Sequence, residues 1–361
     1  MTARRGVAIT GVGVVNAGVV GPSAALGAWL ARPRPAPRTP GPRPAIRVPE
    51  ATLSALVDGG EARRLSRVCQ LTIAAARLAV GESGFDPNRD LSRGLGLVIG
   101  TELGDFTSTI AFADGYLARG PAGISPLLFP NTVMNTMAAT TAIAVVAREL
   151  TLTLNVPTVA GELAIARAAA AVASGRADAV LAGGVDELNP LVGDMLEVLG
   201  DHDVRGEGAA FVMLEAESSA RERGAPVLGR IHGTAWGSLP ARPWGLGRRA
   251  SSRAVAEALE RARLGPPGWI YASASGDAER DAWEARVLAD ALGPASRPTS
   301  SLSPLLGHCA GVGALRVAAA AWTARSGLLP DDAGGEPTRV SGPGLVHGLA
   351  RGGGHVALVV G

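Results

Sequence analysis

Residues 154–184 read LNVPTVAGELAIARAAAAVASGRADAVLAGG, a stretch that predicts a buried strand, a sharp turn, a helix and a second buried strand. Thr158 lies at the turn. A strand that ends abruptly in a helix places one side chain at the helix N-terminus, where free N–H groups and the macrodipole favour negative charge. Such a position suits a nucleophile. A cysteine there has a lowered pKa, whereas a hydroxyl needs a base to remove its proton.

The composition restricts the classes of function. With 361 residues, 47% of them hydrophobic and only 4% aromatic, the chain can bury one large core, or two fused halves, built from Ala, Val and Leu. The 34 basic residues nearly balance the 32 acidic ones, which argues against a nucleic-acid partner. Every basic residue is an arginine, so a mechanism that needs lysine is excluded. The two cysteines, Cys69 and Cys309, lack the spacing of a metal or redox pair. No long apolar run predicts a membrane span. We therefore expect a cytoplasmic protein.

Predicted strands and helices alternate along the chain, which predicts an α/β fold with a parallel sheet covered on both faces. The pattern repeats, so we expect two similar halves, residues 1–200 and 201–361. Strands are expected near both ends and at 94–100, 151–156 and 179–184, and helices from Arg63, from about Ser251, from Glu279 and over 311–327. Pro/Arg-rich segments at 31–50 and 239–250 predict surface loops.

Six segments occur in a characteristic order: ITGVGVV, SPLLFPNTVMNTMAA, GRADAVLAGGVDEL, GEGAAFVMLE, GHCAGVGAL and RGGGHVALVV. In this order they resemble the β-ketoacyl synthases of the thiolase-like fold, over nearly the whole chain. The resemblance implies a duplicated, five-layered α-β-α-β-α architecture. We expect no cofactor and, because His202, His232, His347 and His355 show no ligand spacing, no metal.

In that family a cysteine at the turn carries the acyl chain, two histidines stabilise the enolate formed from a malonyl group, and a lysine completes the site. Matching the segments places Thr158 at the cysteine, Ser275 at the first histidine, Ser303 at the lysine and His308 at the second histidine. Arg351 stands where a gating phenylalanine is expected. Without the thiol, one imidazole and the amine, condensation is not expected.

The resemblance therefore implies a degenerate, catalytically inactive subunit of the chain-length-factor type. Such a subunit forms a heterodimer with an active β-ketoacyl-ACP synthase in polyketide or polyene biosynthesis, meets the acyl carrier protein through that partner, and shapes the acyl tunnel. In the resembling proteins the segment SPLLFPNTVMNTMAA crosses the dimer interface and lines the tunnel. Candidate depth-setting residues are Phe129, Thr132, Met134 and Met137. Chain-length factors commonly carry glutamine where this chain has Thr158.

Two other functions remain open from the residues alone. One is a stand-alone acyltransferase or hydrolase in which His308 activates Thr158, and the other is a structural homodimer. Individual residues also have simpler interpretations. Thr158 could cap the following helix, His308 could be a packed scaffold residue, and Cys309 is either a substitute nucleophile or a buried apolar side chain. Ser275 and Ser303 could simply fill space, and Met134 and Met137 could belong to the core or an interface.

Overall fold

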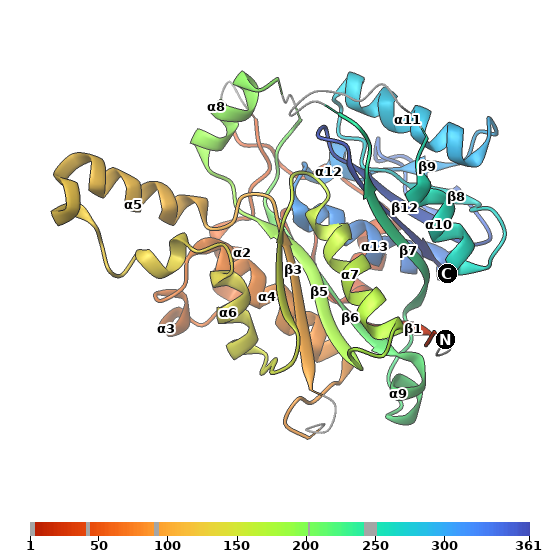
Figure 1. Cartoon of the computed structure of the whole chain (residues 1–361), viewed down its shortest axis with the longest axis horizontal. Coiled ribbons are helices and arrows are strands. Elements are labelled where there is room, and N and C mark those ends of the chain that lie inside the picture. The colour runs from red at the N-terminus through yellow and green to blue at the C-terminus, as the bar shows by residue number, and fades with distance from the viewer. Residues whose placement is uncertain (1–3, 41–43, 90–93, 201–202, 242–250) are drawn as a thin grey trace.

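An eleven-stranded mixed sheet organises the computed structural model, which describes residues 4–40, 44–89, 94–200, 203–241 and 251–361 (Figure 1). The order is β4-β3-β5-β6-β1-β7-β13-β12-β8-β9, and β2 pairs with β1. The first-half strands are β1 (Val7–Asn16), β2 (Val20–Gly21), β3 (Leu95–Thr101), β4 (Thr151–Asn155), β5 (Ala179–Asp186) and β6 (Gly208–Ala216). The second-half strands are β7 (Gly229–Ser238), β8 (Trp269–Tyr271), β9 (Thr299–Ser300), β12 (Gly344–Leu349) and β13 (Gly354–Val360).

The two halves of the sheet share one topology. In the first half β4, β3 and β5 are parallel, and β6 runs antiparallel to both β5 and β1. In the second half β9, β8 and β12 are parallel, and β13 runs antiparallel to both β12 and β7. The halves meet where β1 pairs with β7, from Val7 opposite Ile231 to Ile9 opposite Gly229. This repeat confirms the duplicated α/β architecture that the sequence predicts.

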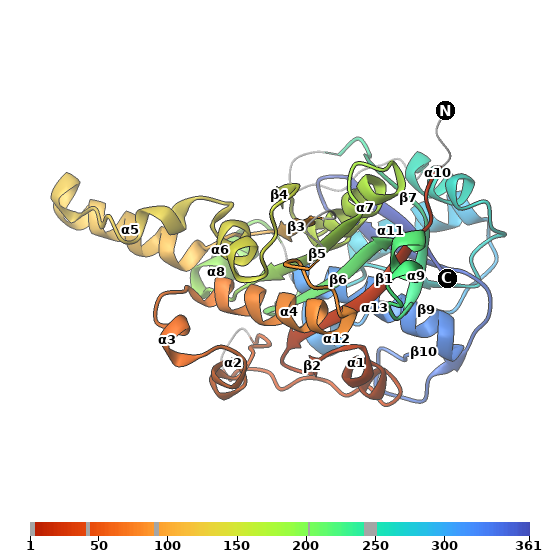
Figure 2. The same cartoon turned by 90° about the horizontal axis from the view of Figure 1, so that it is seen from below.

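Two helices lie between the halves and create the layered arrangement. The helices α7 (Ala160–Ala173) and α13 (Ala310–Ser326) pack against each other and against strands of both halves. Outside them, α4 (Arg67–Ser83) and α6 (Thr136–Ala144) cover the first half, and α10 (Arg253–Ala262) and α11 (Ala278–Leu292) cover the second (Figures 1 and 2). The resulting order of layers is α-β-α-β-α.

A close approach of the two central helices depends on glycine. A Cβ added to Gly161, in the first turn of α7, would lie 2.0 Å from the carbonyl oxygen of Ala310, at the start of α13. No side chain fits there without separating the helices. The alanine-rich composition of both helices has the same effect along their length, because small side chains allow close packing.

One segment projects from this layered body. We call residues 106–134 the arm; it consists of α5 (Phe106–Arg119) and the 3-10 helices Gly120–Gly123 and Phe129–Thr132. Both views show α5 extending away from the sheet (Figures 1 and 2). The remaining elements are α1 (Ser23–Leu30), α2 (Glu50–Leu56), α3 (Gly59–Ala62), α8 (Pro190–Val198), α9 (Glu217–Glu222), α12 (Ser303–Leu306), β10 (Leu328–Leu329) and β11 (Thr338–Arg339).

Three details differ from the sequence-based expectations. The sheet is mixed rather than parallel, because continuous apolar runs report burial of both faces and not strand direction. The junction between the halves falls after β6, not at residue 200, since β6 pairs with β5 and β1 of the first half. The helix expected from Arg63 begins at Arg67 and ends at Ser83, where Gly84 adopts a left-handed conformation. Of the two expected loops, residues 242–250 lie outside the described residues.

Candidate functional site

The turn between β4 and α7 holds Thr158 in a strained backbone conformation. Its φ is +68°, a left-handed value that a β-branched residue rarely adopts. Strain of this kind persists where the surrounding fold imposes it, so the shape of the turn is set by the fold and not by a conformational preference of threonine. The N-cap of α7 is Val159 and receives no side-chain hydrogen bond, so the capping interpretation of Thr158 is wrong.

His308 lies two residues before the start of α13, next to the N-cap residue Cys309. The first turn of α13 packs against Gly161, which lies three residues after Thr158. The backbone of His308 is fixed on both sides, since its N–H donates to Val204 O at 2.7 Å and its carbonyl oxygen accepts from Gly206 N at 3.1 Å. The side chain is buried. Within the described ranges, no hydrogen bond reaches the hydroxyl of Thr158, so the nucleophile–base contact that a hydroxyl-using acyltransferase needs is not formed there.

The positions matched to the family's first histidine and lysine are occupied by serines beside buried arginines. The hydroxyl of Ser275 contacts the Asp203 carboxylate and the Arg280 guanidinium. The hydroxyl of Ser303 accepts a long hydrogen bond of 3.5 Å from Arg316 Nη1. Ser275 and Ser303 are both buried, so each serves as a local hydrogen-bonding group within the packed interior.

Arg316 forms a fully buried ion pair with Glu162 that links the two central helices. Its Nη1 also donates to the carbonyl oxygen of Ala272 at 3.0 Å. Arg280 is buried as well and donates to the carbonyl oxygens of Ser273 at 2.8 Å and Leu349 at 3.3 Å. The guanidinium groups therefore take up the interior space beside the two serines, and their Nη donors are directed at protein acceptors.

Next to this arginine cluster is a buried carboxylate–imidazole pair. Glu284 Oε1 lies 2.7 Å from His347 Nδ1 and accepts hydrogen bonds from the N–H and hydroxyl of Ser273, both at 3.0 Å. Burial opposes ionisation of Glu284, but the hydrogen bond and charge of His347, together with Arg280, hold its pKa below the ordinary value. This buried hydrogen bond ties α11 to β12.

Arg351 is tied to α11 in a similar way. Its guanidinium contacts the carboxylate of Asp277, which is the N-cap of α11 and accepts from Arg280 N at 3.1 Å. The loop between β12 and β13 is thus anchored by a charge pair. A flexible gate at Arg351 would first have to break this contact.

A cavity of about 710 Å³ opens beside His308, and its lining is rich in carboxylates. Asp186 is a buried residue of this lining and accepts hydrogen bonds from Ala310 N at 2.7 Å and Thr101 Oγ1 at 2.9 Å. Burial, and secondarily the charge of Glu102, raises the pKa of Asp186 to about 6. Burial also raises the pKa of Cys309 to about 12, so a thiolate is not available at neutral pH and the substitute-nucleophile interpretation is unsupported.

The expected depth-setting residues separate into two groups. Phe129, Thr132 and Met134 belong to the arm; Phe129 is 58% exposed and Met134 39% exposed. The ring of Phe129 lies 6.1 Å from that of Phe112 on α5, and Met134 covers Gly104. Met137 is instead fully buried in the core between α6, α4 and the sheet. It therefore packs inside the subunit and does not contribute to the exposed surface of residues 129–134.

Among the described residues, no group of three or more His, Cys, Asp or Glu side chains is arranged to hold a metal ion. His232 lies on β7, and His347 and His355 lie on β12 and β13; His202 falls outside the described residues. In the part of the chain that the structure describes, no helix has the length and apolar character needed to cross a membrane.

The sequence-based reasoning missed Arg280, Arg316 and their carboxylate partners. One signal was available for Arg316, which is the only charged residue in the apolar run GVGALRVAAAAW. A lone charge in a helix that is apolar all round indicates a buried ion pair. Nothing comparable identifies Arg280, because ERDAWEAR contains charges on every face of the helix.

Comparisons with known proteins agree with this geometry. Residues 4–203 match the model of the β-ketoacyl synthase N-terminal domain. The chain is 30% identical over 376 residues, covering 92% of it and 88% of the relative, to a putative polyketide β-ketoacyl synthase 1 of Streptomyces virginiae. It is 40% identical over 147 residues, covering 39% of it and 35% of the relative, to the tetracenomycin polyketide synthase ketoacyl synthase beta subunit of Streptomyces glaucescens. Among solved structures it resembles the ishigamide ketosynthase/chain length factor, with a TM-score of 0.87, 22% identity and 99% coverage of both chains.

Proposed function

Because this chain belongs to the β-ketoacyl synthase family, we propose that it is a non-condensing subunit of the chain-length-factor type. It pairs with an active ketosynthase and shapes the tunnel that holds the growing acyl chain of a polyketide or polyene. The observation that carries this proposal is the turn between β4 and α7, which we call the elbow. The fold keeps the strained turn at Thr158, with φ at +68°, but places a hydroxyl there instead of a thiol.

The residues around Thr158 support a subunit that has lost the condensing activity and kept the shape of the site. A threonine hydroxyl is a weak nucleophile unless a base accepts its proton, and within the described residues none is hydrogen-bonded to Thr158. Ser303 and Ser275 carry no charge that could bind a malonyl carboxylate or polarise a thioester. The Nη groups of the arginines beside them are engaged with Glu162 and with backbone carbonyl oxygens, so these donors are not directed at a substrate.

A partner surface is available where the first half of the sheet ends. The strand β4 is the outermost strand of the path and pairs only with β3 among the described strands, so its other edge can accept a strand from a partner. The arm beside it carries exposed apolar side chains: Tyr116, Leu117, Ile124, Leu127, Phe129, Val133 and Met134. We assign this surface to an active ketosynthase, because the relative with 22% identity and matching fold is described as a ketosynthase/chain length factor. An acyl carrier protein would then act through that ketosynthase.

Within this surface we assign depth-setting roles to Phe129, Thr132 and Met134. They lie on a segment that begins in the exposed arm and ends at the buried start of α6. The hydroxyl of Thr132 donates to Phe129 O at 2.8 Å, which holds the short helix in one shape. A pocket floor must be rigid to set a length, and the contact of Phe129 with Phe112 supplies the same restraint from α5.

The test is co-expression of the full chain with a cognate active ketosynthase, followed by measurement of subunit composition and product length. We expect a heterodimer and a defined product. Met134→Trp enlarges a side chain in the arm and should shorten the product, whereas Leu264→Trp, at an exposed position after α10, should not. Products of unchanged length in the Met134→Trp complex would refute the tunnel assignment. A stable homodimer that ignores the ketosynthase would favour the structural alternative.

A further inference from the structure

The arm is attached to the body of the molecule over a short stretch of chain. Its helix α5 packs chiefly against the two 3-10 helices of the arm itself. Ser108, in the first turn of α5, is the one residue of that helix that is buried. Both views show the rest of α5 extending away from the sheet (Figures 1 and 2). The direction of the arm therefore depends in large part on the contacts of residues 101–108, which we call the root.

Three carboxylates bind the backbone of the root. The N–H groups of Glu102 and Leu103 donate to Asp186 at 2.8 and 3.2 Å, that of Thr107 to Glu187 at 3.1 Å, and that of Ser108 to Asp105 at 3.0 Å. Asp186 is the last residue of β5, and Glu187 follows it directly. Asp186 also accepts from Ala310 N, and Glu187 from Val68 N at 3.2 Å, at the starts of α13 and α4. These side chains thus join the root to β5, α13 and α4.

The negative charge of these carboxylates is not balanced by a cation. Asp105, Asp186 and Glu187 are buried, at 3%, 2% and 2% exposure, and none of them forms an ion pair with any described residue. Glu102 does form one, with Arg205 at 2.7 Å. The Oδ2 atom of Asp105 is buried and accepts no hydrogen bond from the described residues. Buried like charges without a counter-ion favour the uptake of a proton.

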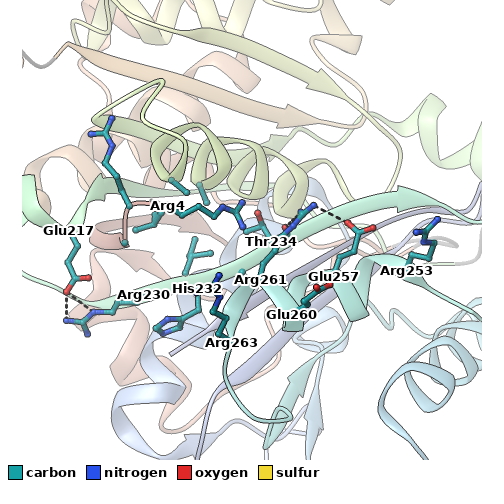
Figure 3. Close-up of a pocket in the computed structure, with 17 residues that line it drawn as sticks. Arg4, Glu217, Arg230, His232, Thr234, Arg253, Glu257, Glu260, Arg261 and Arg263 are labelled. Carbon is teal, nitrogen blue, oxygen red and sulfur yellow. Dashed lines mark hydrogen bonds and ion pairs between the residues drawn. The ribbon is translucent and has the colours of Figure 1, made fainter. Parts of the chain in front are cut away.

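Carboxylates at another site show the contrast. At a cavity of about 990 Å³ lined by β1, β7 and α10, Glu217 binds Arg230 and Glu257 binds Arg261, both at 3.1 Å (Figure 3). An arginine partner stabilises the ionised form of a carboxylate, so these pairs oppose the uptake of a proton. The root instead holds its carboxylates with N–H and hydroxyl donors.

The pKa values at the root are shifted in one direction. Burial, and then the charge of Glu102, raises the pKa of Asp186 to about 6. Burial, and then the charge of Asp105, raises the pKa of Glu187. Burial also raises the pKa of the two neighbouring thiols, so neither is charged at neutral pH. The titratable and charged groups around the two carboxylates or in the cavity beside them also include Arg47, Cys69, Asp194, Glu197, Asp203, Arg205, His308, Cys309 and the pair of Glu207 with Arg67.

We propose that the arm is a hinged element whose opening at the root is controlled by protonation of Asp186 and Glu187. A protonated carboxyl group still accepts hydrogen bonds from the root and carries no charge that repels its neighbours. An ionised carboxylate stays buried among like charges while the root is closed, whereas opening lets water solvate it. Opening therefore lowers the pKa of both groups, and by linkage it becomes more favourable as the pH rises. This behaviour belongs to the chain alone and does not require a ketosynthase.

The experiment is hydrogen–deuterium exchange of the full chain between pH 4.5 and 7.5, read by mass spectrometry and corrected for the intrinsic exchange rate at each pH. If opening restores the ordinary pKa of 3.8 to Asp186, the opening equilibrium of the root should rise roughly 25-fold over this range. Peptides from α7 are the internal reference and should keep their protection. A root whose protection does not change with pH, or changes only together with that of α7, would overturn the proposal.

A pair of double variants tests which carboxylates are responsible. Asp186→Asn/Glu187→Gln removes both charges and keeps one acceptor oxygen in each side chain, so the protection of the root should become nearly independent of pH. The control, Glu217→Gln/Glu257→Gln, removes two carboxylates that have arginine partners and should keep the wild-type pH dependence at the root. An equal pH dependence in the two double variants would overturn the proposal. The wild-type series remains decisive if the first variant does not fold.

A distance measurement shows whether the arm itself moves. Spin labels at Leu117→Cys on α5 and Leu264→Cys after α10 occupy exposed positions, whereas the native Cys69 and Cys309 are buried. The distribution of distances between the labels, measured by pulsed electron paramagnetic resonance, should be broader at pH 7.5 than at pH 4.5. A distribution of the same width at both pH values would contradict a hinge at the root.

Discussion

Truncation of a single arm residue should weaken the heterodimer strongly without affecting the fold of this chain. Leu127 is 88% exposed in the isolated subunit, so nearly all of its side chain is available for burial by a partner. Leu127→Ala removes three carbon atoms, at about 0.8 kcal/mol for each buried CH₂. Scaled by the exposed fraction, the loss is about 2 kcal/mol, which corresponds to a roughly 30-fold increase in Kd.

The assay is surface plasmon resonance of this chain over an immobilised cognate ketosynthase. Leu264→Ala is the matched control, because Leu264 is also an exposed leucine, at 42%, but lies after α10 and away from the arm. Both variants should melt at the wild-type temperature, since neither side chain is part of the core. If Leu127→Ala bound the ketosynthase as tightly as Leu264→Ala, the assignment of the arm to the interface would be refuted.

Three further predictions concern the interior. Thr158→Cys should be alkylated by iodoacetamide at the elbow. It should form no condensation product with malonyl-ACP, because Ser303 supplies no cation. Mass spectrometry tests both outcomes, and a condensed product would contradict the account. Glu162→Ala should lower the free energy of unfolding by about 3–5 kcal/mol in urea titrations, since Arg316 is left as an unpaired buried charge, whereas Glu162→Leu/Arg316→Met should lose less. The pKa of Asp186 is about 6 in the folded state and 3.8 ordinarily, so the folded state binds more protons than the unfolded state between these values. The protonated Asp186 therefore contributes to stability below pH 4, and this contribution falls as the pH rises to 6. Asp186→Asn should therefore flatten the dependence of unfolding free energy on pH between 4 and 6, and an unchanged slope would count against the buried carboxyl as its source.

Much of the fold could be predicted from short apolar runs and their order. The stretch from β4 through α7 to β5 has the predicted sequence of elements, because each has a strong and separate pattern. Strand direction was not predictable, since burial of both faces produces the same apolar run in either orientation. The resemblance placed residues 125–134 of the arm at an interface, but it did not identify the projecting helix α5. Its apolar residues resemble those of a core helix, and only the structure reveals that they face outward.

The residues of the candidate site could also be predicted only in part from the sequence. Thr158 could be located from sequence because a strand–turn–helix junction fixes its position, although its positive φ could not be anticipated from a β-branched residue. The pairing of Arg316 with Glu162 joins residues 154 positions apart, and no local pattern encodes such a contact.

The central claim is that this chain supplies shape and not chemistry, and intact-protein mass spectrometry tests it most directly. The heterodimer with an active ketosynthase is incubated with an acyl-ACP, and each subunit is weighed. The account predicts an acyl adduct on the ketosynthase and the unmodified mass for this chain. An acyl adduct on this chain that maps to Thr158 and disappears in Thr158→Ala would contradict it.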